Sequence, residues 1–280
     1  CGNLKKTQWK NNIMRESREI FYDISFLNKQ DSKPHLLCFN NGVYDFENNE
    51  FRKGYNDDYI TKSTNIDYIP IYECDENIKN EINEFMEQLF PKVELREYMW
   101  EHLASTLIGT NENQTFNIYT GCGRNGKSKL VELMSMILGD YKGSVPITLV
   151  TQGRRAIGSS SSEVVQLQGV RYAVMQEPSK GDKINEGIMK ELTGGDPIQA
   201  RALFKDSITF TPQFKLVVCT NTLFDIASND EGTWRRIRVC DFMSKFKEQE
   251  LIDEDPEEPY QFIVDKKLDK KFPVWKEVFM

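Results

Sequence analysis

The feature that most constrains this chain is the octapeptide Gly121-Cys-Gly-Arg-Asn-Gly-Lys-Ser128, which fits the pattern G-x-x-x-x-G-K-[ST]. An apolar run, residues 116–120, leads into it, and an amphipathic segment, residues 127–138, follows it. This order predicts a strand, a glycine-rich loop and a helix, the arrangement that aims backbone N–H groups at an anion. A chance match to a glycine-rich turn is the alternative, and the flanking segments argue against it.

Each residue of this loop has a predicted part in binding a nucleotide. Lys127 is predicted to reach the β- and γ-phosphates, and Ser128 to place its hydroxyl on Mg²⁺. ATP and Mg²⁺ are therefore the expected cofactors. The residues predicted to surround the phosphates with backbone N–H groups are Gly121, Cys122, Gly123, Arg124, Asn125 and Gly126.

Two later apolar runs end in polar residues suited to the same site. Residues 170–176 read as a buried strand followed by Glu177, a carboxylate placed to hold Mg²⁺ and to orient the attacking water. Gln176 stands where a second acid often sits. Residues 214–220 read as another strand, which ends in Asn221, an amide suited to the γ-phosphate or the lytic water. An asparagine that only starts a turn is the alternative at that position.

Two arginines follow in the segment Thr233-Trp-Arg-Arg-Ile-Arg-Val239. An apolar strand does not need Arg235 or Arg236 for its packing. An arginine offered to the γ-phosphate of a neighbouring subunit would stabilise transition-state charge, an effect on the order of 10³–10⁵ in rate. We predict that Arg235 or Arg236 acts in this way, without a choice between them.

The whole chain predicts an α/β fold, because strand-like and helical runs alternate after residue 115. Before that point, residues 36–52 predict a β-hairpin with a second tight turn near Asn41-Gly42, and helices are expected over 75–90 and 93–108. The other predicted strands are 198–204 and 208–210, a hairpin with a charged tip at Lys205-Asp-Ser207, and the other predicted helix is 185–192.

Three regions are predicted from changes in composition. Residues 1–110 form an N-terminal accessory region, residues 111–245 the ATPase domain, and residues 246–280 an acidic linker with the start of a C-terminal region. The linker is predicted from seven carboxylates and no cation between Glu248 and Glu258, which is typical of a solvated segment.

The net charge of −7 argues against nucleic-acid binding only until the charges are located. Residues 1–115 carry 13 basic and 20 acidic side chains, residues 116–245 carry 17 and 13, and residues 246–280 carry 6 and 10. The middle segment is therefore basic by four charges. No membrane span or signal peptide is evident, and an intracellular protein is expected. Six cysteines and two histidines without metal-ligand spacing make a zinc site or a disulfide scaffold unexpected.

Taken in order, these motifs resemble the superfamily 3 helicases, and within them the poxvirus-type primase–helicases of large DNA viruses and the related phage and plasmid proteins. The resemblance covers roughly residues 36–245 and is far more specific than the phosphate loop alone. It rests on residues 121–128, Glu177, Lys190-Glu-Leu-Thr-Gly-Gly-Asp196, Ala200-Arg201, Thr220-Asn221, Trp234-Arg-Arg236, Asn40-Asn-Gly-Val-Tyr-Asp-Phe46 and Asp58-Tyr-Ile-Thr61.

The resemblance implies an AAA+ type P-loop ATPase that assembles as a hexameric ring around DNA. It implies that Lys127 and Ser128 form the Walker A pair, that Glu177 is the Walker B acid and that Asn221 is the sensor. The arginine finger would be Arg235 or Arg236. The resemblance also implies that Lys190 and Asp196 belong to the motif peculiar to the superfamily, and that a hairpin carries Lys205 to single-stranded DNA in the central channel. Lys190 and Lys205 are therefore the two lysines predicted to contact DNA. An ordinary exposed lysine at a turn is an equally good interpretation of Lys205.

The function expected from the sequence is ATP-dependent nucleic-acid translocation in viral DNA replication, in the host cytoplasm or at a viral replication site. Other replication proteins are conceivable partners, and a membrane is not expected. No primase catalytic constellation is visible, so primase activity would belong to another part of the polypeptide. Two alternatives keep the phosphate loop: a small-molecule kinase, and a nucleotide-gated assembly module that unwinds nothing.

Overall fold

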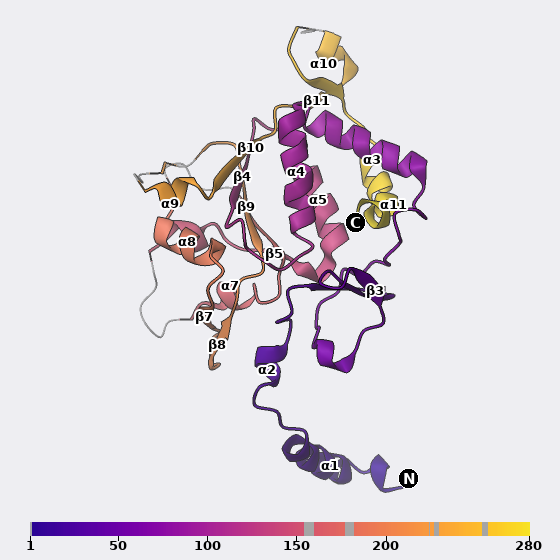
Figure 1. Ribbon diagram of the computed structural model, residues 1–280, viewed down its shortest axis with the longest axis vertical. Helices are drawn as coiled ribbons and strands as arrows, with labels where there is room; N and C mark the ends of the chain where they lie inside the picture. The colour runs from indigo at the N-terminus through magenta and orange to yellow at the C-terminus, as the bar shows by residue number, and fades with distance from the viewer. Residues whose placement is uncertain (1, 154–159, 177–181, 224, 227–229, 254–256) are drawn as a thin grey trace.

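A single parallel sheet forms the centre of the computed structural model, which describes residues 2–153, 160–176, 182–223, 225–226, 230–253 and 257–280 (Figure 1). Its five strands lie in the order β10-β4-β9-β6-β5. All four strand pairs are parallel. The predicted α/β class is therefore confirmed. The strands are β4 (Phe116–Thr120), β5 (Lys142–Ser144), β6 (Tyr172–Gln176), β9 (Lys215–Thr220) and β10 (Ile237–Asp241).

The sheet is buried on both faces, as parallel sheets generally are. Along β6, Tyr172 and Val174 enter one hydrophobic core, whereas Ala173 and Met175 enter the other. The central strands are continuous apolar runs in the sequence because neither of their faces is exposed to water.

Long helices cover one face, and short elements cover the other (Figure 1). The first cover consists of α3 (Glu76–Leu89), α4 (Val93–Ser105), α5 (Lys127–Leu138) and α11 (Leu268–Phe279). The second consists of α6 (Thr148–Thr151), α7 (Ser162–Val165), α8 (Glu186–Thr193) and the antiparallel hairpin of β7 (Ile198–Arg201) and β8 (Ser207–Phe210).

The remaining elements lie around this body. β1 (Leu36–Phe39), β2 (Gly42–Asp45) and β3 (Glu50–Arg52) form an antiparallel sheet with both predicted turns. α1 (Thr7–Ile20), which sequence periodicity did not predict, lies apart from the central sheet (Figure 1). The others are α2 (Phe26–Lys29), α9 (Glu231–Trp234), β11 (Lys245–Lys247), α10 (Gln249–Asp253), β12 (Gln261–Ile263) and short 3-10 turns at Asn3–Lys5, Asn56–Asp58 and Gly139–Tyr141. Within the described ranges, no helix has the length and apolar character that a membrane crossing requires.

The first core is continuous across both predicted region boundaries. Leu37 and Leu89 come from the N-terminal region, Leu130 from the predicted ATPase domain, and Phe272 and Trp275 from the C-terminal end. The division at residues 110 and 246 stays a prediction. The packing shows that the segments on either side of the middle region help to bury its sheet.

Three predicted elements need correction. The helix expected over 93–108 ends at Ser105. The strand expected over 198–204 ends at Arg201, because Arg201 pairs with Ser207 and residues 202–206 form the turn, in which Phe204 has a left-handed backbone with φ of 58°. The acidic segment is not wholly a solvated linker. It contains α10. In addition, the Glu258 carboxylate forms ion pairs with Lys245 and with Lys247, the second at 2.5 Å.

A buried cluster of cations ties the N-terminal region to the amino ends of the central strands. Arg171, which precedes β6, donates to the carbonyls of Leu107 and Leu36, both at 2.8 Å. Lys215, the first residue of β9, donates to the carbonyls of Ile108, at 3.3 Å, and of Thr110. Both cations therefore donate to carbonyl oxygens and not to carboxylates. These hydrogen bonds offset only part of the free-energy cost of burying the two charges.

This environment predicts a pH dependence of stability. Burial, and next the charge of Arg171, lowers the pKa of Lys215 from 10.5 to about 8. The folded chain therefore loses this proton before the unfolded chain does, and folding is favoured as pH rises from about 8 to 10.5. Relative to Lys215→Met, the wild type should gain about 2–3 kcal/mol of unfolding free energy across that window, measured by urea denaturation at a series of pH values.

Lys215→Arg is the matched control, because arginine keeps its charge throughout the window. Both variants should lack the wild-type gain. Parallel pH profiles for all three proteins would contradict the assignment of this gain to Lys215.

Candidate functional site: a phosphate-binding loop at the sheet edge

The predicted loop follows the carboxyl end of β4 and turns into α5, as the sequence pattern requires. Gly121 and Gly126 have φ of 147° and 83°, in the region that favours glycine. A Cβ atom on Gly126 would lie 2.2 Å from Leu89 of α3, and one on Gly121 would lie 2.6 Å from the carbonyl of Phe242. The two glycines are therefore required both by backbone conformation and by the close approach of neighbouring segments.

Lys127 is the buried cation of this site. Its Nζ donates to the Gly121 carbonyl at 2.5 Å and to the Asn221 side-chain oxygen at 3.1 Å. Burial lowers the pKa of Lys127 below its ordinary value. An anion beside the ammonium group would raise the pKa of Lys127 again, because an opposite charge favours the charged form. The structure thus brings together Lys127, the first residue of α5, and Asn221, which follows the end of β9.

A cavity of about 340 Å³ lies beside these groups. The Asn125 side-chain nitrogen is buried here without a hydrogen-bond partner among the described residues, and Ser128 is exposed in the first turn of α5. An unpaired donor, a buried ammonium and a helix N-terminus suit a phosphate chain. The lining residues are Gly123, Arg124, Asn125, Gly126, Lys127, Ser128, Lys129, Val131, Gln176, Cys219, Thr220 and Asn221.

The predicted Mg²⁺ carboxylate falls outside this description. Gln176, the last residue of β6, is exposed and lines the cavity. Glu177, the next residue in the sequence, is not among the described residues, and its role stays a prediction.

A second cavity, of about 560 Å³, lies on the other side of the loop. Arg124, Gly126 and Lys129 line both cavities. Its other walls come from α3, β11 and α11, and the backbone N–H of Phe246 donates to the Arg124 carbonyl at 2.8 Å. The end of β12 also lines this cavity, and the apolar lining residues are Phe85, Leu89, Phe246, Ile263, Val264, Leu268 and Trp275. The loop is therefore enclosed by segments that precede and follow the predicted ATPase domain.

The two candidate finger arginines lie in different environments. Arg235 is exposed, whereas Arg236 is 9% exposed and donates to the Gly232 carbonyl at 2.6 Å. Both donate to the Gln114 side-chain oxygen, at 2.6 and 2.7 Å respectively. The prediction that neither arginine is needed for packing is therefore wrong for Arg236. Both also precede β10 and are not part of it.

These arginines lie at the opposite end of the sheet from the phosphate loop. The backbone N–H of Phe116, at the start of β4, donates to the Arg236 carbonyl at 2.7 Å, whereas the loop begins after Thr120 at the end of that strand. A strand advances about 3.3 Å per residue, so roughly 16 Å of β4 separates the two ends. The structure does not bring Arg235 or Arg236 to the loop of its own chain.

The two predicted DNA-contacting lysines are also separated. Lys190, in the last turn of α8, forms an ion pair with Asp230, and this hydrogen bond lowers the pKa of Asp230 to about 2. Asp230 caps α9 through the backbone N–H of Gly232. Lys190 therefore ties α8 to the segment that carries the arginines. Lys205 is exposed at the tip of the β7–β8 hairpin. A role in DNA binding stays a prediction for both lysines.

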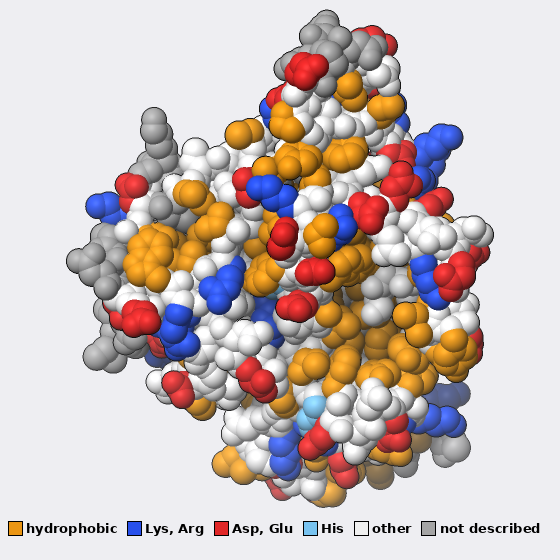
Figure 2. Space-filling view, turned by 45° about the horizontal axis from the view of Figure 1, so that its top comes forward, with side chains coloured by type: hydrophobic (Ala, Val, Ile, Leu, Met, Phe, Trp, Pro, Cys, Tyr) orange, Lys and Arg blue, Asp and Glu red, His pale blue; other side chains and the backbone are white. Residues whose placement is uncertain are grey.

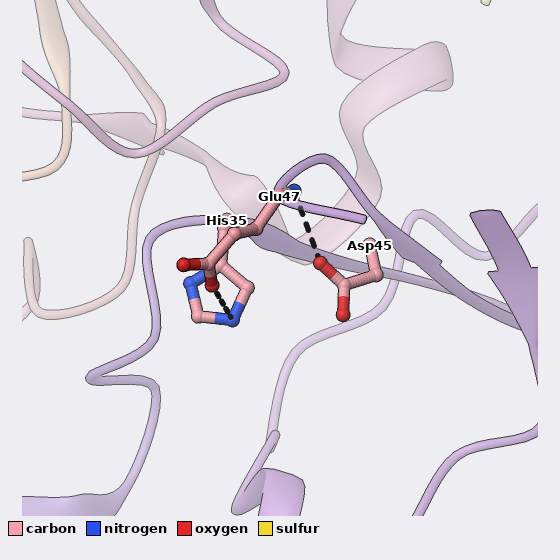
Figure 3. A group of neighbouring side chains, drawn as sticks. All are labelled: His35, Asp45 and Glu47. Atoms are coloured by element: carbon pink, nitrogen blue, oxygen red, sulfur yellow. Dashed lines mark hydrogen bonds and ion pairs between the residues drawn. The ribbon is translucent and has the colours of Figure 1, made fainter. Parts of the chain in front are cut away.

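A cluster of possible metal ligands lies in the N-terminal sheet, where the sequence suggested none (Figure 3). His35 Nε2 lies 3.6 Å from the exposed carboxylate of Glu47. The Asp45 carboxylate accepts from the backbone N–H of Glu47 at 3.0 Å, and from the Asn48 side chain, also at 3.0 Å. Asp45 thus closes the turn between β2 and β3. We assign this cluster to the turn and not to a metal.

Several residues of the site were missed by sequence reasoning. Leu89 and Phe246 enclose the loop from more than thirty positions away, and no local pattern could have indicated them. Gln114, whose side-chain oxygen accepts hydrogen bonds from Arg235 and Arg236, lies in a segment without helical or strand periodicity. Asp230 did carry a signal, because Asp before Glu-Gly-Thr is typical of a helix N-cap.

Two family models match the chain. A family described as D5 N terminal like matches residues 1–91, and a family of unknown function matches residues 119–236. The second match contains the phosphate loop, Asn221 and both arginines.

Several viral proteins are similar over almost the whole chain. "Putative helicase L207/L206" of Acanthamoeba polyphaga mimivirus is 43% identical over 99% of this chain, and "Putative helicase 121R" of Invertebrate iridescent virus 3 is 33% identical over 96%. "Putative primase C962R" of African swine fever virus is 28% identical over 94%. The chain spans only 29%, 29% and 27% of the length of these relatives.

Among solved structures, an apo form of the C-terminal region of NrS-1 has a similar fold. Its TM-score is 0.52 at 12% sequence identity, and the match covers 76% of this chain and 48% of that chain. This likeness concerns the fold alone.

The enclosure of the loop can be tested with two glycine substitutions. Gly126→Ala places a methyl group against Leu89, whereas Gly123→Ala, at φ of 74°, meets open space. Each variant should lose about 1–2 kcal/mol of unfolding free energy, because alanine is strained in a left-handed backbone conformation. Gly126→Ala should lose about 1 kcal/mol more, because its methyl group crowds Leu89. Chemical denaturation measures both values.

A second change separates strain from crowding. In the Gly126→Ala background, Leu89→Ala should cost less than it does in the wild type, because it removes the atoms that the new methyl group meets. Strict additivity of the two changes would contradict the proposed contact.

Proposed function

We propose that this chain, which belongs to the primase–helicase group of large DNA viruses, contains the ATPase core of a nucleic-acid translocase in viral DNA replication. One observation carries the proposal: Lys127 and Asn221 meet beside a cavity at the carboxyl edge of a parallel sheet, where open α/β sheets bind ligands. Because the chain spans under a third of its relatives, the activity of the whole protein is part of this proposal.

The residues of the loop would hold the phosphates of ATP. Lys127 would exchange its bonds to Gly121 and Asn221 for phosphate oxygens, which would free the Asn221 amide to orient the lytic water. The side-chain nitrogen of Asn125 would gain a partner. Ser128 and Glu177 would hold Mg²⁺. Bound Mg²⁺–ATP supplies a γ-phosphoryl group that water can attack in line, with the metal neutralising charge.

The second cavity would take the nucleoside end of the nucleotide. It adjoins the phosphate cavity at Arg124 and Lys129, and its wall combines aromatic side chains with the carboxylates of Glu81 and Glu84. Ligand sites commonly combine an apolar wall with a few polar groups in this way. Nucleotide binding would then join α3 and α11 to the loop.

The positions of the arginines favour hydrolysis between subunits. Arg235 is exposed and lies about one strand length from its own phosphate loop, so it is available to a neighbouring chain and not to its own. We propose Arg235 as the finger and a structural role for Arg236. In a closed ring, with six subunits as the expected number, every phosphate loop would lie next to Arg235 of a neighbouring subunit.

The proposed ring is compatible with the acidic net charge of the chain if positive side chains line its central channel. The segment with the surplus of four positive charges contains the β7–β8 hairpin and Lys205. On the face in Figure 2, acidic and basic side chains are interspersed, so no large single-sign patch covers it. A nucleic acid held in a narrow channel needs positive charge only along that channel.

Assembly and nucleic-acid response separate this proposal from its rivals. ATP turnover per chain should rise with protein concentration and rise again with single-stranded DNA, because each site needs a neighbour's Arg235. Turnover that is flat in both titrations would favour a monomeric small-molecule kinase. A complete absence of turnover, with nucleotide-dependent assembly, would favour the assembly module.

The trans arrangement predicts complementation. Lys127→Ala should lose the phosphate contact, and Arg235→Ala should lower turnover on the order of 10³-fold. Mixed rings should regain part of the activity, because some interfaces combine an intact loop with an intact arginine. Arg236→Ala is the comparison: it should lower the thermal midpoint of unfolding and should complement Lys127→Ala less well. Failure of the Arg235→Ala mixture would contradict the assignment.

A further inference from the structure

The β7–β8 hairpin is fixed at its base, and residues 203–206 at its tip are exposed. Ile198, Ala200 and Phe210 are buried in the second core. The Arg201 carbonyl accepts a hydrogen bond from the backbone N–H of Ser161 at 2.8 Å, and the backbone N–H of Arg201 donates to the Ser161 hydroxyl at 3.0 Å. Figure 1 shows the connecting turn directed away from the sheet. Whatever the tip contacts therefore meets a rigid support.

The tip exposes a phenylalanine that the fold does not use. Phe204 is 93% exposed, the highest value among the described large hydrophobic side chains, and the adjacent Leu203 is 62% exposed. The ring contributes nothing to either core. Burial cannot explain a phenylalanine at this position.

Backbone conformation does not explain it either. Phe204 has φ of 58°, where glycine or asparagine is favoured and a bulky side chain is strained. The turn closes through its backbone, with the N–H of Lys205 donating to the Ala202 carbonyl at 3.2 Å. Such strain at an exposed position points to a use for the side chain outside the folded chain.

The groups around the ring indicate what it contacts. Lys205 follows Phe204 directly in the sequence, and Arg201 Nε donates to the Lys205 carbonyl at 2.9 Å. The turn that carries the ring therefore also carries two cationic side chains and one carboxylate, that of Asp206. Aromatic rings beside cations are the usual means of holding single-stranded nucleic acid, because every base has a face for stacking and every nucleotide a phosphate.

We infer that Phe204 stacks on a base of single-stranded nucleic acid, while Lys205 and Arg201 contact its backbone. This inference rests on the proposed function and adds a base contact to it. A ring held at a rigid tip would grip a base in any sequence, as a translocase requires.

The test compares two strands that differ only in their bases. Full chain with an ATP analogue is titrated with fluorescent oligothymidylate, and with an abasic strand of equal length. Phe204→Gly should bind oligothymidylate about tenfold more weakly than wild type and the abasic strand equally well. Lys205→Ala should weaken both and reduce the salt dependence of binding. Phe204→Trp should retain the affinity of the wild type for oligothymidylate.

Glycine relieves the strained turn, so Phe204→Gly should keep or raise the thermal midpoint, and a folding defect cannot mimic the result. Tyr72→Ala removes an aromatic side chain that is 81% exposed elsewhere and should leave binding unchanged. Equal losses on both strands, no loss, or a change in oligomeric state with Phe204→Gly would overturn the inference alone. A wild type that binds neither strand would overturn the proposed function as well.

Discussion

The enclosure of the phosphate loop follows from a parallel sheet that must be buried on both faces. Parallel strands leave no face for water, so the five central strands need two covers, and the middle segment of the chain supplies only part of them. α3 and α4 from before the sheet and α11 from after it complete the first cover. Leu89 and Phe246 reach the phosphate loop for this reason: the elements that bury the sheet also enclose the site at its edge.

The two edges of the sheet are used differently. At the carboxyl edge, Lys127 and Asn221 leave a cavity open beside a buried ammonium group. At the amino edge, Arg171, Lys215 and Arg236 are buried, and their terminal nitrogens donate to carbonyl and amide oxygens of the chain itself. Lys127 also donates to oxygens of the chain, but it lies beside a cavity that a ligand could enter, whereas the cations at the amino edge tie segments of the chain together. Arg235 is the exception at the amino edge, because it remains exposed.

The sequence was sufficient for the parts of the structure that depend on local patterns. The octapeptide required a strand, a loop and a helix, and the continuous apolar runs of β6 and β9 required burial on both faces. Parts that depend on distant contacts could not be predicted. The role of Arg236 depends on Gln114, more than a hundred positions away, and the ion pair of Lys190 depends on Asp230. The turn that follows β7 contains a left-handed residue, Phe204, whose side chain is an unusual choice for that conformation and gave no local signal of a turn.

The hairpin and the nucleotide site are joined through β9, and the joint is stiff. Between β8 and β9, the Asn111 side chain donates to the Pro212 carbonyl at 3.1 Å, the Gln213 side chain donates to the Asp31 carbonyl at 2.6 Å, and Phe214 is buried. β9 then runs directly to Asn221. A hairpin anchored in this way has no hinge of its own at this joint. If the proposed ring moves the tip along a strand with nucleotide state, these contacts favour rotation of whole subunits over bending at this joint, and the arginine proposed to come from the neighbouring chain would be a suitable trigger.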